Sequence, residues 1–281
     1  MSEEKKNPMV PQEVAEPQEE VESEAGIPER EEAKEEEEEE VLRWTLSQRI
    51  QHVTLFTCFG LLIITGFPVL LPGFPFVRNL FFFQGSFLLR GIVHRTAAVG
   101  LILLSIYHIG YSLFSERGNR DLKEMLPRKK DFQDFWGTFL FNIGRRKEKP
   151  LYERFSFIEK FEYWAVVWGS YIMIVTGFLL WFEEAALALF PKWVFDIVVT
   201  IHGFEAILAF LAVIIWHFYN VHFNPEVFPM SRIWITGKIS KKKLMERHPL
   251  EYKKMLEEKR KTKALKALEE QIEGERKNDD Q

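Results

Sequence analysis

The histidines of this chain are the side chains best suited to bind a metal. The seven are His52, His94, His108, His202, His217, His222 and His248. All except the last fall within or at the edge of long apolar stretches, where an ionisable side chain is costly and usually functional. A single histidine in such a stretch often only hydrogen-bonds to a neighbouring helix. Because two stretches each carry a pair, the pattern favours metal binding.

The spacing within each pair places the imidazoles at two depths. His202 and His217 end the stretch HGFEAILAFLAVIIWH. In an α-helix their separation turns the second side chain about 60° from the first and raises it roughly 22 Å. His94 and His108 are similarly related, at about −40° and roughly 21 Å. Each helix therefore presents two imidazoles on broadly one side.

The other residue types narrow the choice of cofactor. Cys58 is the single cysteine, which excludes thiolate zinc sites, iron–sulfur clusters and c-type haem attachment. No carboxylate is expected at the depths of the paired histidines. The cofactor that takes two axial imidazoles in an apolar slot is haem b. We expect two haems, stacked across the bilayer as an electron path.

Four segments are long and apolar enough to cross a bilayer as helices. They run approximately over residues 49–71, 90–114, 162–182 and 194–222. The sequence thus predicts an all-α membrane protein with a four-transmembrane-helix bundle. The connection 115–161 holds 12 basic residues and region 231–281 holds 15, which predicts cytoplasmic N and C termini. The apolar connection 72–89 is expected to be a short interfacial helix or a re-entrant piece.

The bundle is expected to lie between two charged tails. Residues 1–42 form an acidic tail that should be disordered, because residues 1–40 contain 17 Glu and few apolar side chains. Residues 43–230 are the predicted cytochrome-like membrane domain. Residues 231–281 form a basic, partly helical tail suited to anionic lipid headgroups.

The two halves of the bundle resemble each other. IITGFPVL (63–70) is echoed by IVTGFLLW (174–181), and the histidine pairs repeat at a similar offset. Two internally similar helix pairs would bring His94 to His202 and His108 to His217. Arg90 and Arg95 lie where the propionates of an outer haem would emerge.

The motifs that carry a family resemblance lie in all four spans. They are RIQH...ITG, HRTAA, KFEYW...VTG and HGFEA...WHFY, followed by ITGKISKKKLMERHPLEY. Over residues 43–255 the chain resembles the bacterial di-haem cytochromes b, which include the formate dehydrogenase gamma subunit and the cytochrome b subunits of hydrogenases and thiosulfate reductases. The resemblance implies an outer haem between His94 and His202. It also implies an inner haem between His52 and His217, whereas the internal echo favours His108 with His217.

The resemblance is weaker at the quinone site. The family uses an asparagine, a glycine and a glutamine before the third span, and the aligned residues here are Ser156, Ile158 and Glu159. Asn142, which is followed by Ile-Gly, would take the place of the family's quinone-binding residues. The histidine left over from the inner haem, together with His222, would serve quinone binding or proton entry, or ligate a third haem.

The resemblance implies an electron-transfer subunit of a bacterial inner-membrane oxidoreductase. Its expected partners are an extracytoplasmic iron–sulfur or multihaem cytochrome subunit, quinone and the lipid membrane, with no nucleic acid. Redox chemistry at the quinone is its only expected catalysis. Two alternatives remain: a cytochrome that works without a dedicated catalytic subunit, and a haem-free anchor or transporter whose histidines relay protons.

Overall fold

The fold is a bundle of long apolar helices, seen in a computed structural model that describes residues 39–71, 73 and 86–279. The bundle helices are α2 (Leu46–Leu70), α4 (Ser86–Phe114), α7 (Phe157–Trp181) and α9 (Lys192–Leu211). The last continues into the π-helical segments η2 (Ala212–His217) and η3 (Tyr219–Phe223). Within the described residues, these make four candidate membrane spans, as predicted.

Capping residues decide where the first helix of each pair begins. The Thr45 side chain accepts a hydrogen bond from the backbone of Gln48, and the Gln48 side chain accepts one from the Thr45 backbone. Ser156 and Glu159 make the same reciprocal cap on α7. Both helices therefore start a few residues before the predicted apolar spans, because caps require polar side chains.

The helices pack as two hairpins, α2 with α4 and α7 with α9, and contact between the hairpins is sparser. Gly100 permits the close approach of the first pair, since a Cβ there would lie 2.9 Å from the Cys58 sulfur. Large apolar side chains such as Phe56, Trp168 and Phe204 remain exposed on the outer faces. This surface suits contact with lipid rather than water.

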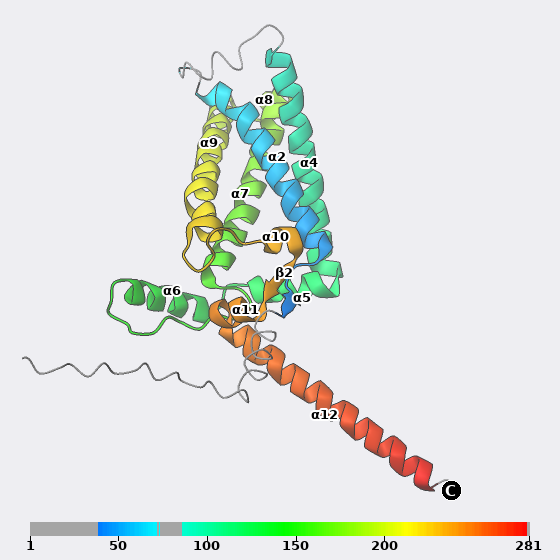
Figure 1. The fold of residues 1–281 in the computed structure, drawn as a ribbon. Helices are drawn as coiled ribbons and strands as arrows, with labels where there is room; N and C mark the ends of the chain where they lie inside the picture. Colours follow the sequence, from blue (N-terminus) through cyan, green and yellow to red (C-terminus); the bar gives the residue numbers. More distant parts are fainter. Residues whose placement is uncertain (1–38, 72, 74–85, 280–281) are drawn as a thin grey trace, which may run out of the picture.

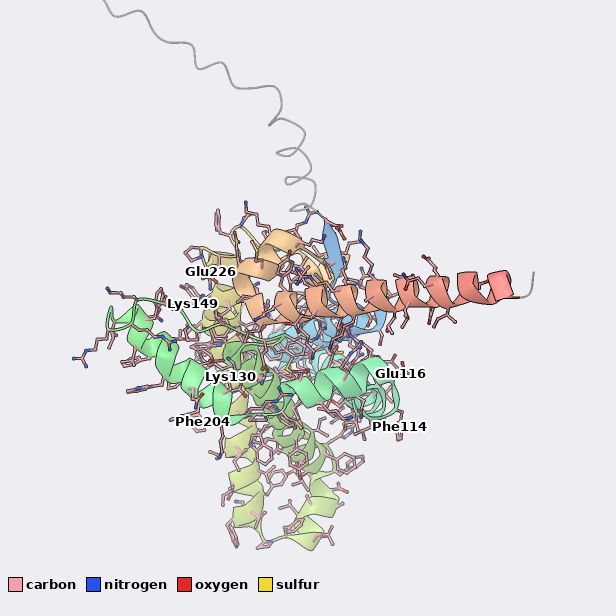
Figure 2. The ribbon with its side chains drawn as sticks, turned by 90° about the horizontal axis from the view of Figure 1, so that it is seen from below. Phe114, Glu116, Lys130, Lys149, Phe204 and Glu226 are labelled. Atoms are coloured by element: carbon pink, nitrogen blue, oxygen red, sulfur yellow. The ribbon has the colours of Figure 1, made fainter. Side chains whose placement is uncertain are left out.

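Short elements gather at one end of the bundle (Figure 1). They are β1 (Glu40–Leu42), α5 (Glu116–Met125), α6 (Lys129–Asn142), α10 (Ile233–Thr236), β2 (Lys238–Ser240), α11 (Lys241–Arg247) and α12 (Pro249–Asp279). The helix α8 (Glu183–Leu189) lies at the opposite end. Figure 2 shows α6 and α12 projecting to opposite sides, with Lys149 beside Glu226, its ion-pair partner at 2.5 Å.

The two predicted tails meet at this end, since β1 pairs antiparallel with β2. Residues 40–42 were expected in the acidic tail and residues 238–240 in the basic one. The rest of the acidic tail, residues 1–38, lies outside the described residues. So does most of the predicted interfacial connection, while its last residues, 86–89, begin α4.

A group of buried and part-buried polar side chains, here named the junction cluster, joins these elements. Its members are Arg43, Asp121, Arg154, His248 and Glu251. Arg154 pairs with Asp121 at 3.0 Å and with Glu251 at 2.7 Å, and Glu251 also pairs with Arg43. The cluster links the chain before α2 with α5, the start of α7 and α12.

Candidate functional site

The outer histidines, His94 of α4 and His202 of α9, are each held by a threonine. Thr65 Oγ lies 2.8 Å from His94 Nδ1, and Thr176 Oγ lies 2.8 Å from His202 Nδ1. Each hydroxyl also donates its one proton to the carbonyl four residues earlier in its own helix. The hydroxyls must therefore accept from Nδ1–H, which leaves the lone pair on Nε2 of each imidazole.

A glycine lies beside each of these rings. A Cβ added at Gly66 would lie 3.5 Å from Cε1 of His94, and one at Gly177 would lie 3.2 Å from Cε1 of His202. The repeated Thr-Gly sequence thus makes one cradle for an imidazole in each half of the molecule.

The predicted propionate residues lie near this outer pair. Arg90 donates to the Thr65 carbonyl at 3.0 Å, and its buried Nε has no hydrogen-bond partner among the described residues. Arg95 is exposed and lies over the Trp181 ring, 5.5 Å from its centroid. Arg90 is therefore tied to the Thr65 cradle, whereas Arg95 lies on the bundle surface.

The inner histidines that face each other are His52 of α2 and His217 of η2, with ring centroids 6.4 Å apart. Trp44 and Trp234 flank His52 at 5.4 and 6.1 Å. Two nitrogens that bind one metal ion from opposite sides, each at about 2 Å, bring the ring centroids to about 6 Å. The observed spacing fits one metal ion between these imidazoles.

A carboxylate holds His217, contrary to the expectation that none would lie at this depth. Oε2 of Glu162 lies 3.0 Å from His217 Nδ1, and Oε1 accepts from Asn220 at 2.9 Å. Nδ1–H of His217 therefore donates to the carboxylate, and Nε2 keeps its lone pair. The π-helical winding of η2 also alters the rotation between His202 and His217 from the value for a regular α-helix.

His108, the alternative inner ligand, uses both ring nitrogens in hydrogen bonds across α2 and α7. Nδ1 lies 2.7 Å from Gln51 Oε1, and Nε2 lies 3.0 Å from the Tyr163 hydroxyl. The Gln51 oxygen can only accept, so Nδ1 carries the proton and Nε2 accepts from Tyr163. Neither nitrogen of His108 has a free lone pair of the kind that the four candidate ligands, His52, His94, His202 and His217, offer.

Comparison with known proteins identifies the family of the chain. The family model described as prokaryotic cytochrome b561 matches residues 43–234, which span all four bundle helices. The chain belongs to the prokaryotic cytochrome b561 family. It is also 26% identical over 230 residues to the "Formate dehydrogenase, cytochrome b556(fdo) subunit" of Escherichia coli K12, and equally to those of strains O6:H1 and O157:H7. The alignment covers 81% of this chain and 97% of each relative.

Membership of this cytochrome b family implies haem b, and the donor set fits that group. Within the described residues, no three His, Cys, Asp or Glu side chains gather where they could hold a metal ion, so the candidate ligands come in twos. Nδ1 of His52 is buried without a hydrogen-bond partner in that part of the chain. Paired imidazoles among apolar side chains are the ligands that a haem iron takes.

The predicted quinone residues are dispersed. Ser156 and Glu159 cap α7 together, and Glu159 lies 3.9 Å from Arg43 of the junction cluster. Asn142 ends α6, which projects from the bundle, and His222 packs against Phe218. No hydrogen bond, ion pair or ring contact joins Asn142 or His222 to the Ser156–Glu159 cap in the described chain.

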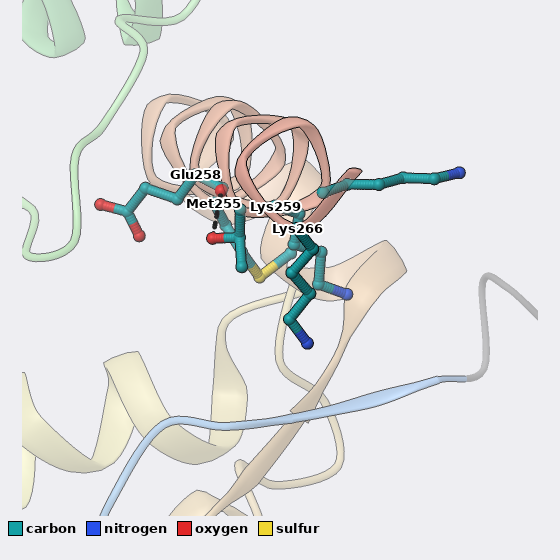
Figure 3. Close-up of a pocket in the computed structure, with 6 residues that line it drawn as sticks. Met255, Glu258, Lys259 and Lys266 are labelled. Atoms are coloured by element: carbon teal, nitrogen blue, oxygen red, sulfur yellow. Dashed lines mark hydrogen bonds between the residues drawn. The ribbon is translucent and has the colours of Figure 1, made fainter. Parts of the chain in front are cut away.

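A surface pocket on α12 lies apart from these residues (Figure 3). Its lining residues are Met255, Glu258, Lys259, Thr262, Lys263 and Lys266. None of the predicted site residues lines it, so it has no part in the histidine sites.

Sequence reasoning missed the residues that orient the imidazoles. Thr65 and Thr176 stand in the ITG and VTG echo, which was interpreted only as a sign of internal symmetry. Glu162 stands in KFEYW, which was interpreted only as a family motif. A search for hydrogen-bond acceptors repeated at the same place in both halves would have found the threonines.

Proposed function

We propose that this chain is the electron-transfer subunit of a formate dehydrogenase-like membrane complex, and that it works between an extracytoplasmic redox partner and the quinone pool. The observation that carries the proposal is the arrangement of four histidines in one membrane bundle: the rings of His52 and His217 face each other, and His94 and His202 are held in equivalent Thr-Gly cradles. In the proposed assignment His94 and His202 form the outer pair, and His52 and His217 form the inner pair. Two haem b groups bound there would supply one-electron carriers at two depths of the membrane.

The chain's own residues prepare the two sites. Thr65, Thr176 and Glu162 accept from Nδ1–H of three of the imidazoles, so that each Nε2 keeps the lone pair that would bind a haem iron. Trp44 and Trp234 shield His52. An apolar surround of this kind limits water access and thereby influences the reduction potential.

The partners follow from the relatives and from the charge distribution. The relatives' name places them in formate dehydrogenase, and 97% of their length is matched. We assign the α8 end to the extracytoplasmic side, where an iron–sulfur or multihaem subunit would dock, since the basic connection and tail lie at the other end. Quinone would react on the side of the junction cluster, with Ser156, Glu159, Asn142 and His222 as candidate contacts.

The test is a haem count on the purified, full-length chain expressed with ample haem. We expect a b-type α band in the reduced-minus-oxidised spectrum and two haems per polypeptide. A colourless protein would overturn the proposal in favour of a haem-free anchor or transporter. Copurification of an iron–sulfur or multihaem polypeptide would support a complex, and its absence from membranes of the native host would favour a cytochrome that works alone.

Single substitutions test the inner ligands. We expect His52→Ala and His217→Ala each to retain one haem, and His108→Ala to retain both, because both ring nitrogens of His108 are already hydrogen-bonded. Retention of two haems in His52→Ala with loss of one in His108→Ala would show that the assignment is wrong.

A further inference from the structure

The two histidine pairs differ in what accepts the proton of Nδ1. In the outer pair both acceptors are neutral hydroxyls, from Thr65 and Thr176. In the inner pair His217 is bonded to the carboxylate of Glu162, while Nδ1 of His52 has no partner among the described residues. The outer and inner pairs therefore differ in the charge of the group that accepts from Nδ1.

The position of Glu162 is fixed from both sides. One carboxylate oxygen accepts from His217 at 3.0 Å and the other accepts from Asn220 at 2.9 Å. Both donors belong to the π-helical end of the fourth span, and Glu162 belongs to α7. With 19% of its side chain exposed, the carboxylate is mostly shielded, so its interaction with His217 is weakly screened.

We infer that Glu162 is a positioning residue that, through Nδ1 of His217, lowers the reduction potential of the inner site below that of the outer site. A carboxylate that accepts from the far ring nitrogen raises the basicity of the ligating nitrogen. A more basic ligand and a nearby negative charge both stabilise the oxidised, more positive iron. A charge-assisted hydrogen bond is roughly twice as strong as a neutral one, so the threonine hydroxyls exert less of this effect.

This inference rests on the proposed function, and a redox titration separates the two. The haem count of the wild-type protein tests the function first. In a spectroelectrochemical titration, the inner potential is identified as the one that disappears in His52→Ala. We expect Glu162→Gln to raise that potential by about 59 mV or more. For one electron this shift is a tenfold change in the ferrous-to-ferric ratio at a given potential. The amide oxygen can still accept from Nδ1–H, and the Asn220 amide can turn its oxygen toward the new NH2 group, so the change removes the charge and keeps both hydrogen bonds.

Asn220→Ala is a second variant, which should shift the inner reduction potential in the opposite direction. Removing that donor leaves the carboxylate a stronger acceptor for His217, so the inner potential should fall by a smaller amount. This variant decides the matter if Glu162→Gln loses the inner haem: a lower potential supports the inference, and an unchanged one overturns it.

Glu205→Gln is the matched control. Glu205 is also a carboxylate within a span, but it lies against Gly169 and makes no hydrogen bond to a histidine in the described chain. We expect it to leave the inner potential unchanged. An equal shift in Glu205→Gln, an equal shift at both haems in Glu162→Gln, or no shift in Glu162→Gln with normal haem content would overturn the inference.

Discussion

The threonine hydroxyls that fix the outer imidazoles lead to a test at the scale of single residues. Thr176→Val keeps the shape of the side chain but removes the acceptor for His202 Nδ1–H. The imidazole tautomer is then no longer fixed, and outer-shell losses of this kind typically lower metal affinity by about 10–100-fold. We expect haem titration into the apoprotein to show a weakened outer site and an unchanged inner one.

Thr57→Val is the control for this substitution. The Thr57 hydroxyl makes the same hydrogen bond to the carbonyl four residues earlier, at 2.8 Å, but makes no hydrogen bond to a histidine among the described residues. It should bind haem like the wild type. Equal affinities in Thr176→Val and Thr57→Val would refute a role for Thr176 in ligand orientation.

The residues predictable from the sequence were those whose presence in an apolar segment is itself unusual. Six histidines stood out because an imidazole is costly in lipid, and only the family resemblance favoured His52 over His108 for the inner haem. Thr65 and Thr176 gave no such signal, because a threonine in a membrane helix satisfies its hydroxyl within its own helix. Only the fold shows which histidine lies within reach of that hydroxyl.

At the scale of elements, the corner between α4 and α5 offers a stability prediction. Ser115 caps α5 through the Gly118 backbone, and a Cβ at Gly118 would lie 2.2 Å from the Tyr111 carbonyl oxygen. Backbone cannot move aside as a flexible side chain can. We expect Gly118→Ala to lower the free energy of unfolding by about 1–3 kcal/mol, measured by thermal unfolding in detergent.

Gly110→Ala, earlier in α4, is the matched control. A Cβ there meets nothing within 4 Å. Alanine is also favoured over glycine within a helix, by roughly 0.5–1 kcal/mol, so this variant should be neutral or slightly stabilised. If both variants unfolded at the same temperature, steric contact at the α4–α5 corner would not explain the need for glycine.

The spans were predictable as elements because length and apolar composition are properties of the sequence. Their first turns were not, because the caps at Thr45 and Ser156 are polar and fall outside any apolar window. The π-helical winding that ends the fourth span was also missed. Asn220 in this segment donates to Glu162 of α7, a contact between spans that the sequence does not show.

At the scale of the whole molecule, the pairing of β1 with β2 and the junction cluster were not predictable. Their members lie far apart in the sequence, and they were predicted in different regions: β1 in the acidic tail, β2, His248 and Glu251 in the basic tail, and Asp121 and Arg154 in the connection 115–161. Arg43 and Glu251, for example, are 208 residues apart. Charge alone could not show that these side chains are paired and that Arg43 is buried.

The junction cluster should make stability depend on pH through His248. Arg43 donates to Nε2 of His248 and the Glu153 carbonyl accepts from Nδ1, so the buried imidazole is neutral. Burial lowers the pKa of His248, with a further contribution from Arg43, against the opposing effect of Glu159. As the pH falls below about 6.5, the unfolded chain gains a proton that the folded protein resists, so stability is lost. Thermal unfolding should therefore shift to lower temperature between about pH 7.5 and 5.5.

His248→Gln removes the titrating group from this cluster. The variant should be less stable near neutral pH, because the substitution removes a buried imidazole that makes two good hydrogen bonds. Its unfolding temperature should nevertheless change less between the two pH values. An identical pH dependence in variant and wild type would mean that His248 is not the responsible group.

The orientation of the whole bundle gives the last prediction. Lys129 is exposed at the junction-cluster end and Lys192 is exposed at the opposite end. The excess of basic residues in the 115–161 connection and the C-terminal region favours a cytoplasmic position for the junction-cluster end. In right-side-out vesicles, a membrane-impermeant maleimide should therefore label Lys192→Cys and leave Lys129→Cys unlabelled until the membrane is opened. The wild-type protein, whose single Cys58 is buried, supplies the background. The reverse labelling pattern would show that the bundle has the opposite orientation, with the proposed quinone side at the extracytoplasmic face.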